Sequence, residues 1–326
     1  MTSKVMVTGG AGFVGARLVQ RLLAEGLTVY VYDAAPKDKA HRLSPVISHS
    51  CLHYTEGDLR DTEALKRWYV KDAGCLYHLA SVVGVRYYMS DPLALIDIVV
   101  GGTRALLELA SAHNTRVLFT STSEVYGKNM NTPWSETDDR VLGPASVDRW
   151  SYSTAKAVCE HMLFAMHRAK GLEFSTVRFF NVYGPGQAPI FVASQSIYRA
   201  LRNEAPDLYD GGEQTRCFTY VDDAVEAVIR ASRSEKAIGE AINIGSNTES
   251  TMNELLKEII DASGNKLTPR PFSTKERYGD VYEDIPRRVP AVAKARALLD
   301  WEATTPLSKG IALTMEWAKA NEWWLE

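Results

Sequence analysis

The chain has 326 residues, of which 45% are hydrophobic and 24% are charged, and its formal net charge is -3. This length and composition are typical of a globular protein with a sizeable core and two lobes. The small net charge and the lack of a long basic run exclude the electrostatic signature of a nucleic-acid-binding or membrane-surface protein, so we expect neither partner.

Other compositional features favour a cytoplasmic protein. The four cysteines, Cys51, Cys75, Cys159 and Cys217, are scattered without the spacing of metal ligands. We therefore expect buried reduced thiols and no metal site. Met1 leads almost directly into the first predicted strand, so we expect no signal peptide. No uninterrupted apolar stretch of the sequence is long enough to span a bilayer.

The N-terminal segment predicts a dinucleotide-binding turn. Lys4 to Thr8 is an apolar run typical of a strand, and apolar residues then recur at helical spacing from Val14 to Leu22. The intervening TGGAGFVG sequence therefore lies on a strand-to-helix turn, where glycines let the backbone bend and approach a pyrophosphate. We assign to the cofactor site Gly9, Gly12, Phe13, Val14 and Gly15.

An acidic residue closes the second predicted strand. This strand runs from Thr28 to Tyr32 and is followed by Asp33. Asp33 stands at the distance from the glycines at which an acidic side chain accepts hydrogen bonds from adenosine ribose hydroxyls. A carboxylate there repels a ribose phosphate, so the sequence predicts NAD rather than NADP. The alternative is an ordinary βαβ turn with a solvated aspartate.

Strand-like and helix-like segments alternate along the next part of the chain. We expect strands at 52–56, 75–80, 116–121 and 174–180, and helices at 61–69, at 92–113 and around Lys156. This alternation predicts an α/β fold with a Rossmann-type, doubly wound parallel sheet in a domain that spans residues 1–181.

Beyond residue 181 the pattern changes. Gly184-Pro185-Gly186 breaks the chain, and helices are expected at 192–203, from the N-cap Asp222 to Ser232, at 292–299 and at 307–321. A strand at 241–244 predicts that a segment near 217–245 returns to the first domain. Residues 182–326 should otherwise form a smaller, sequence-interleaved substrate lobe. We interpret its tryptophans as core packing: Trp301, Trp317, Trp323 and Trp324.

A tyrosine and a lysine supply candidate catalytic chemistry. Tyr152 and Lys156 share one face of a predicted helix. A phenol is a poor base at neutral pH, but a neighbouring ammonium and a positively charged nicotinamide ring favour the phenolate. The pair follows the segment from Phe119 to Gly127, which leaves the carboxyl end of a strand, where open α/β sheets build their sites.

These motifs together resemble those of the extended short-chain dehydrogenases/reductases that modify nucleotide sugars, over essentially the whole chain. The matching segments are Thr8 to Gly15, Gly57-Asp58-Leu59, His78-Leu79-Ala80, Thr122 to Gly127, Tyr152 with Lys156, Arg178 to Asn181, and Arg216 to Asp222. The resemblance implies a homodimer formed through the long helices at 93–113 and around Tyr152.

The resemblance also implies roles for individual residues. It makes Thr122 the hydroxyl that binds the reacting sugar oxygen, Tyr152 the base and Lys156 the residue that tunes it. Asn181 and Arg216 should bind the nucleotide diphosphate, for which amide and guanidinium donors are suited. The cofactor site should further include Asp58, Leu59, Leu79 and Ala80, together with Tyr152 and Lys156.

The family's subclasses differ immediately after Thr122. Sugar 4-epimerases usually carry small residues at the next two positions, whereas this chain has Ser123 and Glu124. A carboxylate there resembles uronate decarboxylases and 4,6-dehydratases. In dehydratases of the thymidine-nucleotide type, an aspartate that protonates the departing oxygen stands at the position of Ser123, and serine is also seen there in other dehydratases.

Further stretches resemble decarboxylases of UDP-glucuronate, namely Leu142-Gly143-Pro144 with Arg149 to Ser153, and Arg287 to Pro290. Arg288 falls on an arginine proposed to protonate the sugar after carbon dioxide leaves, although similar arginines in relatives bind the diphosphate. Tyr88 matches a tyrosine that approaches the uronate. Phe191 departs from the pattern, because decarboxylases usually carry an arginine there.

The leading hypothesis is NAD-dependent decarboxylation of UDP-glucuronate through a 4-keto intermediate, which gives UDP-xylose or a UDP-4-keto-pentose. The catalytic set is Thr122, Glu124, Tyr152, Lys156 and Arg288, and the substrate-binding set is Tyr88, Ser123, Asn181, Arg216 and Arg288. The alternatives are a C4 epimerase of UDP-glucose or UDP-glucuronate, a 4,6-dehydratase, and a non-enzymatic NAD sensor or interaction protein. The last usually shows a broken Thr-Tyr-Lys set, and this chain has all three residues.

Overall fold

Seven parallel strands form the main sheet. The structure, a computed structural model, describes residues 3–84, 90–278 and 285–326. The strand order is β11-β6-β5-β4-β1-β2-β3. The strands are β1 (Lys4–Thr8), β2 (Thr28–Asp33), β3 (Leu52–Glu56), β4 (Cys75–His78), β5 (Arg116–Thr122), β6 (Phe174–Phe179) and β11 (Glu240–Ile244). The order reverses between β1 and β4, which is the switch point at which such sheets bind ligands.

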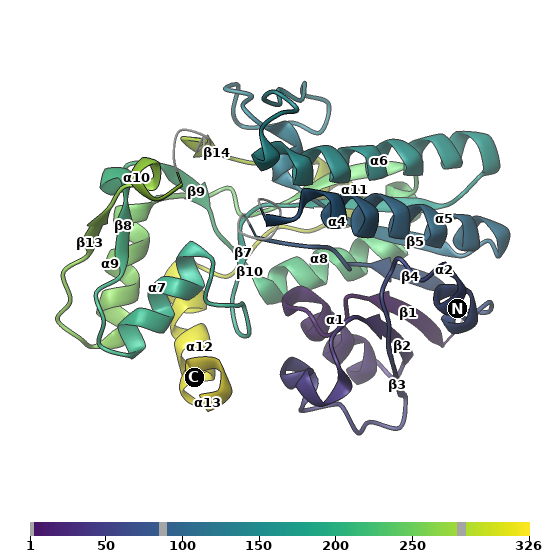
Figure 1. The fold of residues 1–326 in the computed structure, drawn as a ribbon, viewed down its shortest axis with the longest axis horizontal. Coiled ribbons are helices and arrows are strands. Elements are labelled where there is room, and N and C mark those ends of the chain that lie inside the picture. The colour runs from purple at the N-terminus through teal and green to yellow at the C-terminus, as the bar shows by residue number, and fades with distance from the viewer. Residues whose placement is uncertain (1–2, 85–89, 279–284) are drawn as a thin grey trace.

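Helices cover both faces of this sheet, which confirms the predicted doubly wound α/β fold (Figure 1). One core packs under α1 (Phe13–Ala24), α8 (Val221–Arg233) and α11 (Ala293–Leu299), and the other under α2 (Thr62–Trp68), α5 (Gly102–Ala112) and α6 (Ser151–Lys170). Val5 and Val7 enter the first core and Met6 enters the second. Burial on both faces explains why the strands are almost continuously apolar.

The remaining elements form small sheets and helices, most of which lie to the left in Figure 1. The sheets pair β10 (Thr219–Tyr220) with β7 (Val182–Tyr183), β13 (Arg270–Phe272) with β8 (Asp207–Tyr209), and β9 (Thr215–Cys217) with β12 (Glu249–Thr251) and β14 (Arg287–Arg288). The helices are α7 (Val192–Leu201), α9 (Met252–Ser263), α10 (Thr274–Tyr278), α12 (Leu307–Lys319) and α13 (Glu322–Leu325). Because β11 pairs with β6, the main sheet does include a late segment. The domain boundary at residue 181 stays a prediction.

Three details differ from the sequence analysis. The helix expected at 92–113 is divided into α4 (Pro92–Ile96) and α5 by a π-helical stretch at Asp97–Gly101. Helix α8 starts at Val221 with Tyr220 as its N-cap, so the expected cap Asp222 was wrong; Asp222 instead pairs with Arg17 of α1. Of the four unpaired cysteines, Cys51 is half-buried rather than buried.

Neither a membrane-spanning helix nor a metal-binding cluster occurs among the described residues. None of the helices in that part of the chain combines the length and the apolar character needed to cross a membrane. Nor do three or more His, Cys, Asp or Glu side chains gather there in a way that could hold a metal ion.

Candidate active site

The turn between β1 and α1 has no room for side chains at its glycines. Gly9 has a φ of +73°, and a Cβ there would lie 2.6 Å from the backbone nitrogen of Ala80. A Cβ at Gly15 would lie 2.0 Å from the Gly9 carbonyl oxygen. Gly12 is the N-cap of α1 and brings no capping side chain, so the positive end of the helix is left for an anion. This cradle fits a pyrophosphate.

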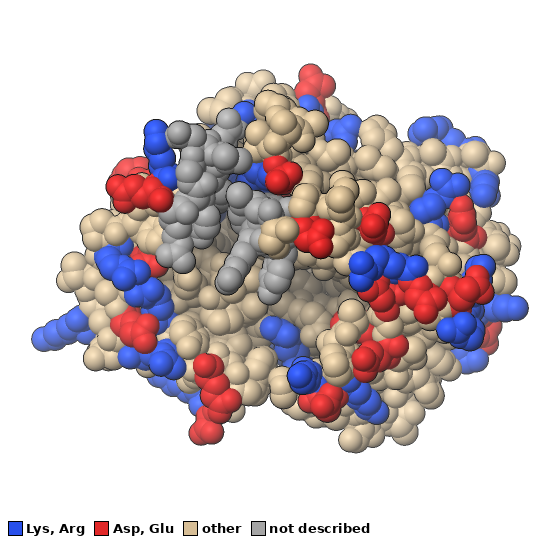
Figure 2. All heavy atoms as spheres, in the orientation of Figure 1, with Lys and Arg blue, Asp and Glu red and all other residues tan. Residues whose placement is uncertain are grey.

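The predicted cofactor residues at the end of β4 lie against this turn. The Leu79 backbone nitrogen donates to the Thr8 carbonyl at 3.1 Å, and that of Ala80 donates to Thr8 Oγ1 at 3.3 Å. The strand order therefore brings Leu79 and Ala80 beside Gly9, as expected for the two strands that flank a switch point. The face drawn in Figure 2 is hollowed near its middle, and acidic and basic side chains are interspersed around it.

Asp33 holds the turn in place. Its Oδ2 accepts a hydrogen bond from the Ala11 nitrogen at 2.8 Å, and its Oδ1 accepts one from the Ala35 nitrogen at 2.9 Å. Each carboxylate oxygen has a second lone pair, so Asp33 can still accept hydrogen bonds from ribose hydroxyls. The sequence analysis proposed the ribose contact and missed the structural one. Together, the glycine turn and this acid fit NAD.

The predicted adenine-flanking residues follow β3. Asp58 forms an ion pair with Arg60 at 2.6 Å, and the Tyr32 hydroxyl donates to the Asp58 carbonyl at 3.1 Å. Leu59 is buried beside Gly102 of α5, where a Cβ would lie 2.6 Å from the Leu59 Cβ. Both residues therefore stand at the carboxyl end of the sheet, which supports their predicted place near the cofactor.

Lys156 and Tyr152 are both buried on α6. The Lys156 Nζ donates a hydrogen bond to the Thr120 carbonyl at 2.8 Å and lies 4.6 Å from the centroid of the Phe119 ring. Burial lowers the pKa of Lys156 to about 8. The lysine is thus tied to strand β5, whose last residue is Thr122.

The structure changes the expected tuning of Tyr152. Burial raises the pKa of its phenol, the Glu124 carboxylate raises that pKa further, and the nearby Ser81 side chain lowers it. Burial dominates the pKa of the phenol in the protein alone, and the expectation that Lys156 favours the phenolate stays a prediction. Positive charge near the phenol has to outweigh both burial and Glu124 before Tyr152 can act as a base.

The turn after β5 presents the residues that distinguish the subclasses. Residues Ser123–Tyr126 form a 3-10 helix whose N-cap is Thr122, and Thr122 Oγ1 accepts a hydrogen bond from the Glu124 nitrogen at 3.2 Å. Ser123 is buried beneath this turn. Thr122, Glu124 and Tyr152 thus come from the carboxyl end of β5 and the start of α6.

Two arginines hold the Glu124 carboxylate. Arg149 Nη2 contacts Oε2 at 2.6 Å, and Arg288 of β14 pairs with Oε1. The Glu124, Arg149 and Arg288 side chains are 16%, 1% and 9% exposed. Burial by itself would raise the pKa of Glu124, but the charges and hydrogen bonds of Arg288 and Arg149 lower it to about 2. Glu124 is therefore a carboxylate at neutral pH.

Arg149 was missed as a site residue by the sequence analysis, which noted it only as part of a matching stretch. It lies on a short 3-10 helix, Asp148–Trp150, that leads directly into α6. The signal that could have found it is its position three residues before Tyr152, on the turn that approaches the catalytic helix. Its contact with Glu124 is not visible in the sequence.

The predicted diphosphate ligands come from the neighbouring small sheet and the end of β6. Arg216 and Arg288 are register partners on the parallel strands β9 and β14, so their side chains leave the same face. Asn181 has a φ of +39°, and its Nδ2 donates to the Cys217 carbonyl at 3.3 Å. The structure thus brings Asn181 next to β9. Tyr88 lies outside the described residues.

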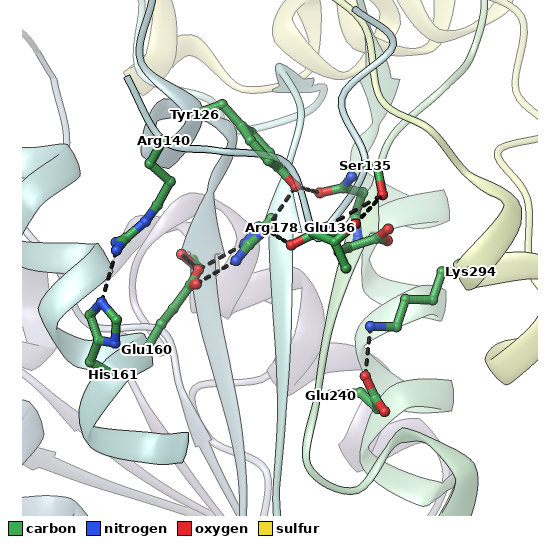
Figure 3. Close-up of polar contacts among 12 residues, drawn as sticks. Tyr126, Ser135, Glu136, Arg140, Glu160, His161, Arg178, Glu240 and Lys294 are labelled. Atoms are coloured by element: carbon green, nitrogen blue, oxygen red, sulfur yellow. Dashed lines mark hydrogen bonds and ion pairs between the residues drawn. The ribbon is translucent and has the colours of Figure 1, made fainter. Parts of the chain in front are cut away.

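A buried polar network supports the turn after β5 (Figure 3). Arg178 of β6 pairs with Glu160 of α6 at 2.7 Å, and its Nη1 donates to the Tyr126 hydroxyl at 2.8 Å. The Ser121 hydroxyl donates to Glu160 at 2.6 Å. Since Ser121 and Tyr126 flank Thr122 and Glu124 in the sequence, the network fixes both ends of the turn relative to α6.

Known proteins are similar to this chain over almost its full length. The family model described as the NAD dependent epimerase/dehydratase family matches residues 5–245. A UDP-N-acetyl-alpha-D-glucosaminuronate decarboxylase of Bacillus cytotoxicus is 36% identical over an alignment of 338 residues that covers 99% of both chains. UDP-glucuronic acid decarboxylase 2 of Arabidopsis thaliana is 34% identical over 318 residues, 96% of this chain and 67% of that relative.

Solved structures with the same fold include epimerases. The UDP-glucose 4-epimerase of Thermotoga maritima with UDP-glucose has a TM-score of 0.87 at 28% identity and covers 97% of this chain and 99% of its own. The UDP-glucuronic acid 4-epimerase from Bacillus cereus, in complex with UDP-glucuronic acid and NAD, has a TM-score of 0.85 at 26% identity, with coverage of 97% and 99%.

Proposed function

This chain belongs to the NAD-dependent epimerase/dehydratase family of extended short-chain dehydrogenases/reductases, and from that premise we propose that it is a decarboxylase of a UDP-linked uronic acid. The observation that carries the proposal is the buried Glu124 carboxylate between Arg149 and Arg288. Two guanidinium charges and one carboxylate leave one net positive charge at this place. A uronate brings a negative charge that suits it, whereas a neutral hexose does not.

The curated relatives support the same reaction class. Both are named as decarboxylases, one for UDP-N-acetyl-alpha-D-glucosaminuronate and one for UDP-glucuronic acid. The two sugars share the carboxylate and differ at carbon 2. We propose UDP-glucuronate as the substrate, with the N-acetylated uronate as the alternative.

The residues divide the reaction between two steps. The glycine turn and Asp33 would hold NAD, which would supply the hydride acceptor and donor for sugar carbon 4. Tyr152 takes the proton from the 4-hydroxyl, and the Thr122 hydroxyl hydrogen-bonds the same oxygen. The resulting 4-keto group accepts the electron pair that carbon dioxide leaves behind, so the protein supplies mainly position and proton donors.

Protonation at carbon 5 follows the loss of carbon dioxide. Because the pKa of Glu124 is about 2, this residue cannot donate the proton at neutral pH. The donor is Arg288 or a water that the pair holds, and Glu124 orients it. The product is a UDP-4-keto-pentose, which becomes UDP-xylose when the hydride returns. Asn181 and Arg216 bind the diphosphate.

We further propose a cytoplasmic homodimer. The exposed apolar side chains of Leu93, Ile96 and Val158 lie on α4 and α6. These are the helices through which the family resemblance implies dimerisation. Light scattering of the native protein and of Leu93→Glu would test it, because the substitution places a charge in the proposed interface.

Product analysis tests the reaction. Purified protein is incubated with UDP-glucuronate, the N-acetylated uronate, UDP-glucose and UDP-galactose, and carbon dioxide release and product mass are followed. A decarboxylase gives carbon dioxide and a lighter product from a uronate, and Tyr152→Phe should strongly slow the formation of both. The similarity to solved epimerases supports C4 epimerisation as the second candidate. Epimerised sugar of unchanged mass without carbon dioxide would replace the proposal with that function.

A further inference from the structure

We propose that Arg149 is a positioning residue that acts through Glu124, by holding that carboxylate opposite Arg288 and at a fixed place relative to Tyr152. The effect of Arg149 on turnover depends on the proposed function of the site, whereas the contact between Arg149 and Glu124 does not. The sequence motifs and the family resemblance imply no role for Arg149.

The surroundings of Arg149 restrict its side chain. It is 1% exposed, its Nη2 lies 2.6 Å from Glu124 Oε2, and its guanidinium carbon lies 5.2 Å from the centroid of the Trp150 ring. An arginine that is buried, ion-paired and close to an aromatic ring has little freedom to move. It is therefore suited to fix the orientation of its partner.

The two arginines hold Glu124 in different ways. Arg149 precedes α6, the helix that carries Tyr152, whereas Arg288 lies on β14 of a separate small sheet. Each arginine takes one carboxylate oxygen. Without Arg149 the carboxylate would be free to rotate toward Arg288, and its tether to the start of the Tyr152 helix would be lost.

The buried ion pair of Arg178 and Glu160 stabilises the fold, and it differs from the contact of Arg149 with Glu124. Arg178 binds both oxygens of Glu160, and Ser121 also donates to that carboxylate. Glu160 is thus enclosed by its own partners. Glu124 is held at its two oxygens from opposite parts of the chain, and its charge acts on the Tyr152 phenol.

Among the described residues, Arg149 and Arg288 are the charged groups that lower the pKa of Glu124, and Glu124 in turn raises the pKa of Tyr152. Removing Arg149 takes away one of the two charges that offset the Glu124 carboxylate, so this carboxylate raises the pKa of the Tyr152 phenol further. Because Tyr152 must lose its proton to act as the base, the acidic limb of the pH profile of kcat should then move to higher pH. A loss of packing alone would not move it.

A double-mutant cycle tests the proposal with the NAD-loaded enzyme. Arg149→Met should lower kcat on the order of a hundredfold, the size of effect that a small misplacement can cause, while NAD affinity changes little. Arg149→Lys should recover part of kcat and keep the acidic limb near its native position. Combining Arg149→Met with Glu124→Gln should be no slower than Glu124→Gln alone.

Arg116 offers a matched control. It is a buried arginine at the other end of β5, and it donates to the Ala231 carbonyl at 3.1 Å. Arg116→Met should lower Tm as a structural loss does, and leave the pH profile of kcat unchanged.

Additive losses in the cycle, or an acidic limb of Arg149→Met that stays in place, would overturn the proposal. If Arg149→Met does not fold, the Arg149→Lys cycle with Glu124→Gln gives the same test of additivity. The cycle uses whichever nucleotide sugar the enzyme turns over. Its failure is therefore distinct from failure of the proposed function, which shows as no carbon dioxide from either uronate.

Discussion

Replacing Glu124 with glutamine removes the negative charge between Arg149 and Arg288 while keeping the size of the side chain. The guanidinium groups, 1% and 9% exposed, would then face each other across a neutral amide. Leaving buried charges without their counter-charge costs about 3–5 kcal/mol. The pKa shift gives a similar figure, because a fall from 4.5 to about 2 corresponds to about 3 kcal/mol.

The loss of unfolding free energy in Glu124→Gln should become smaller as the pH falls. The pKa of Glu124 is depressed in the folded protein, so its contribution is fully present above 4.5 and is lost as pH falls toward about 2. Urea denaturation of the native protein and Glu124→Gln should therefore show a large difference at neutral pH that shrinks through this window. A difference that stays constant from neutral pH down to pH of about 3 would refute the reasoning.

The matched control is Glu249→Gln. Glu249 pairs with Arg287, the neighbour of Arg288, but both side chains of that pair are partly exposed. An exposed pair of this kind is worth about 0–1 kcal/mol, so the control should cost little. In the assay with substrate, Glu124→Gln should stall after hydride transfer and accumulate enzyme-bound NADH, visible in absorbance. Normal turnover of this variant would favour the epimerase.

Three further predictions concern the cofactor and the base. Tyr152→Phe should bind NAD normally and lose about a hundred- to ten-thousandfold in turnover, and near-native turnover would show that another residue is the base. NAD should bind far more tightly than NADP. Asp33→Ala should reduce this difference in affinity, and it should also weaken NAD binding because the Ala11 amide loses its acceptor. Equal affinity of the native protein for NAD and NADP, measured by calorimetry, would contradict this. Gly15→Ala should abolish NAD binding in the same assay, since its Cβ would meet the Gly9 carbonyl; native affinity would show that the turn can relax.

The sequence predicted the parts of this molecule that depend on local pattern. The strand Lys4–Thr8 and the helix after Gly12 follow from apolar periodicity, and the glycine turn follows from the need for close backbone approach. The carboxyl ends of β1 and β4 meet because parallel strands place their ends together, which puts Ala80 beside Gly9. These are consequences of the fold class.

The parts that the sequence could not supply depend on tertiary contact. Asp222 has the residue type of a helix cap, but Arg17 of α1 provides a competing charged partner. The raised pKa of Tyr152 comes from burial and from Glu124, and burial of a side chain is decided by the packing of the whole site. Arg149 lies far from Glu124 in the sequence, and no periodicity connects them.

The contact between Glu124 and Arg288 joins a residue inside the segment that the family model matches to a residue outside it. The family model ends at residue 245, so it includes the glycine turn, Glu124, Tyr152 and Lys156 and leaves out Arg288. Under the proposed function, the matched part therefore holds the residues for oxidation at carbon 4. We propose that the chemistry at carbon 5, and with it the reaction class, depends on the charge that Arg288 of β14 presents to Glu124 from outside the matched segment.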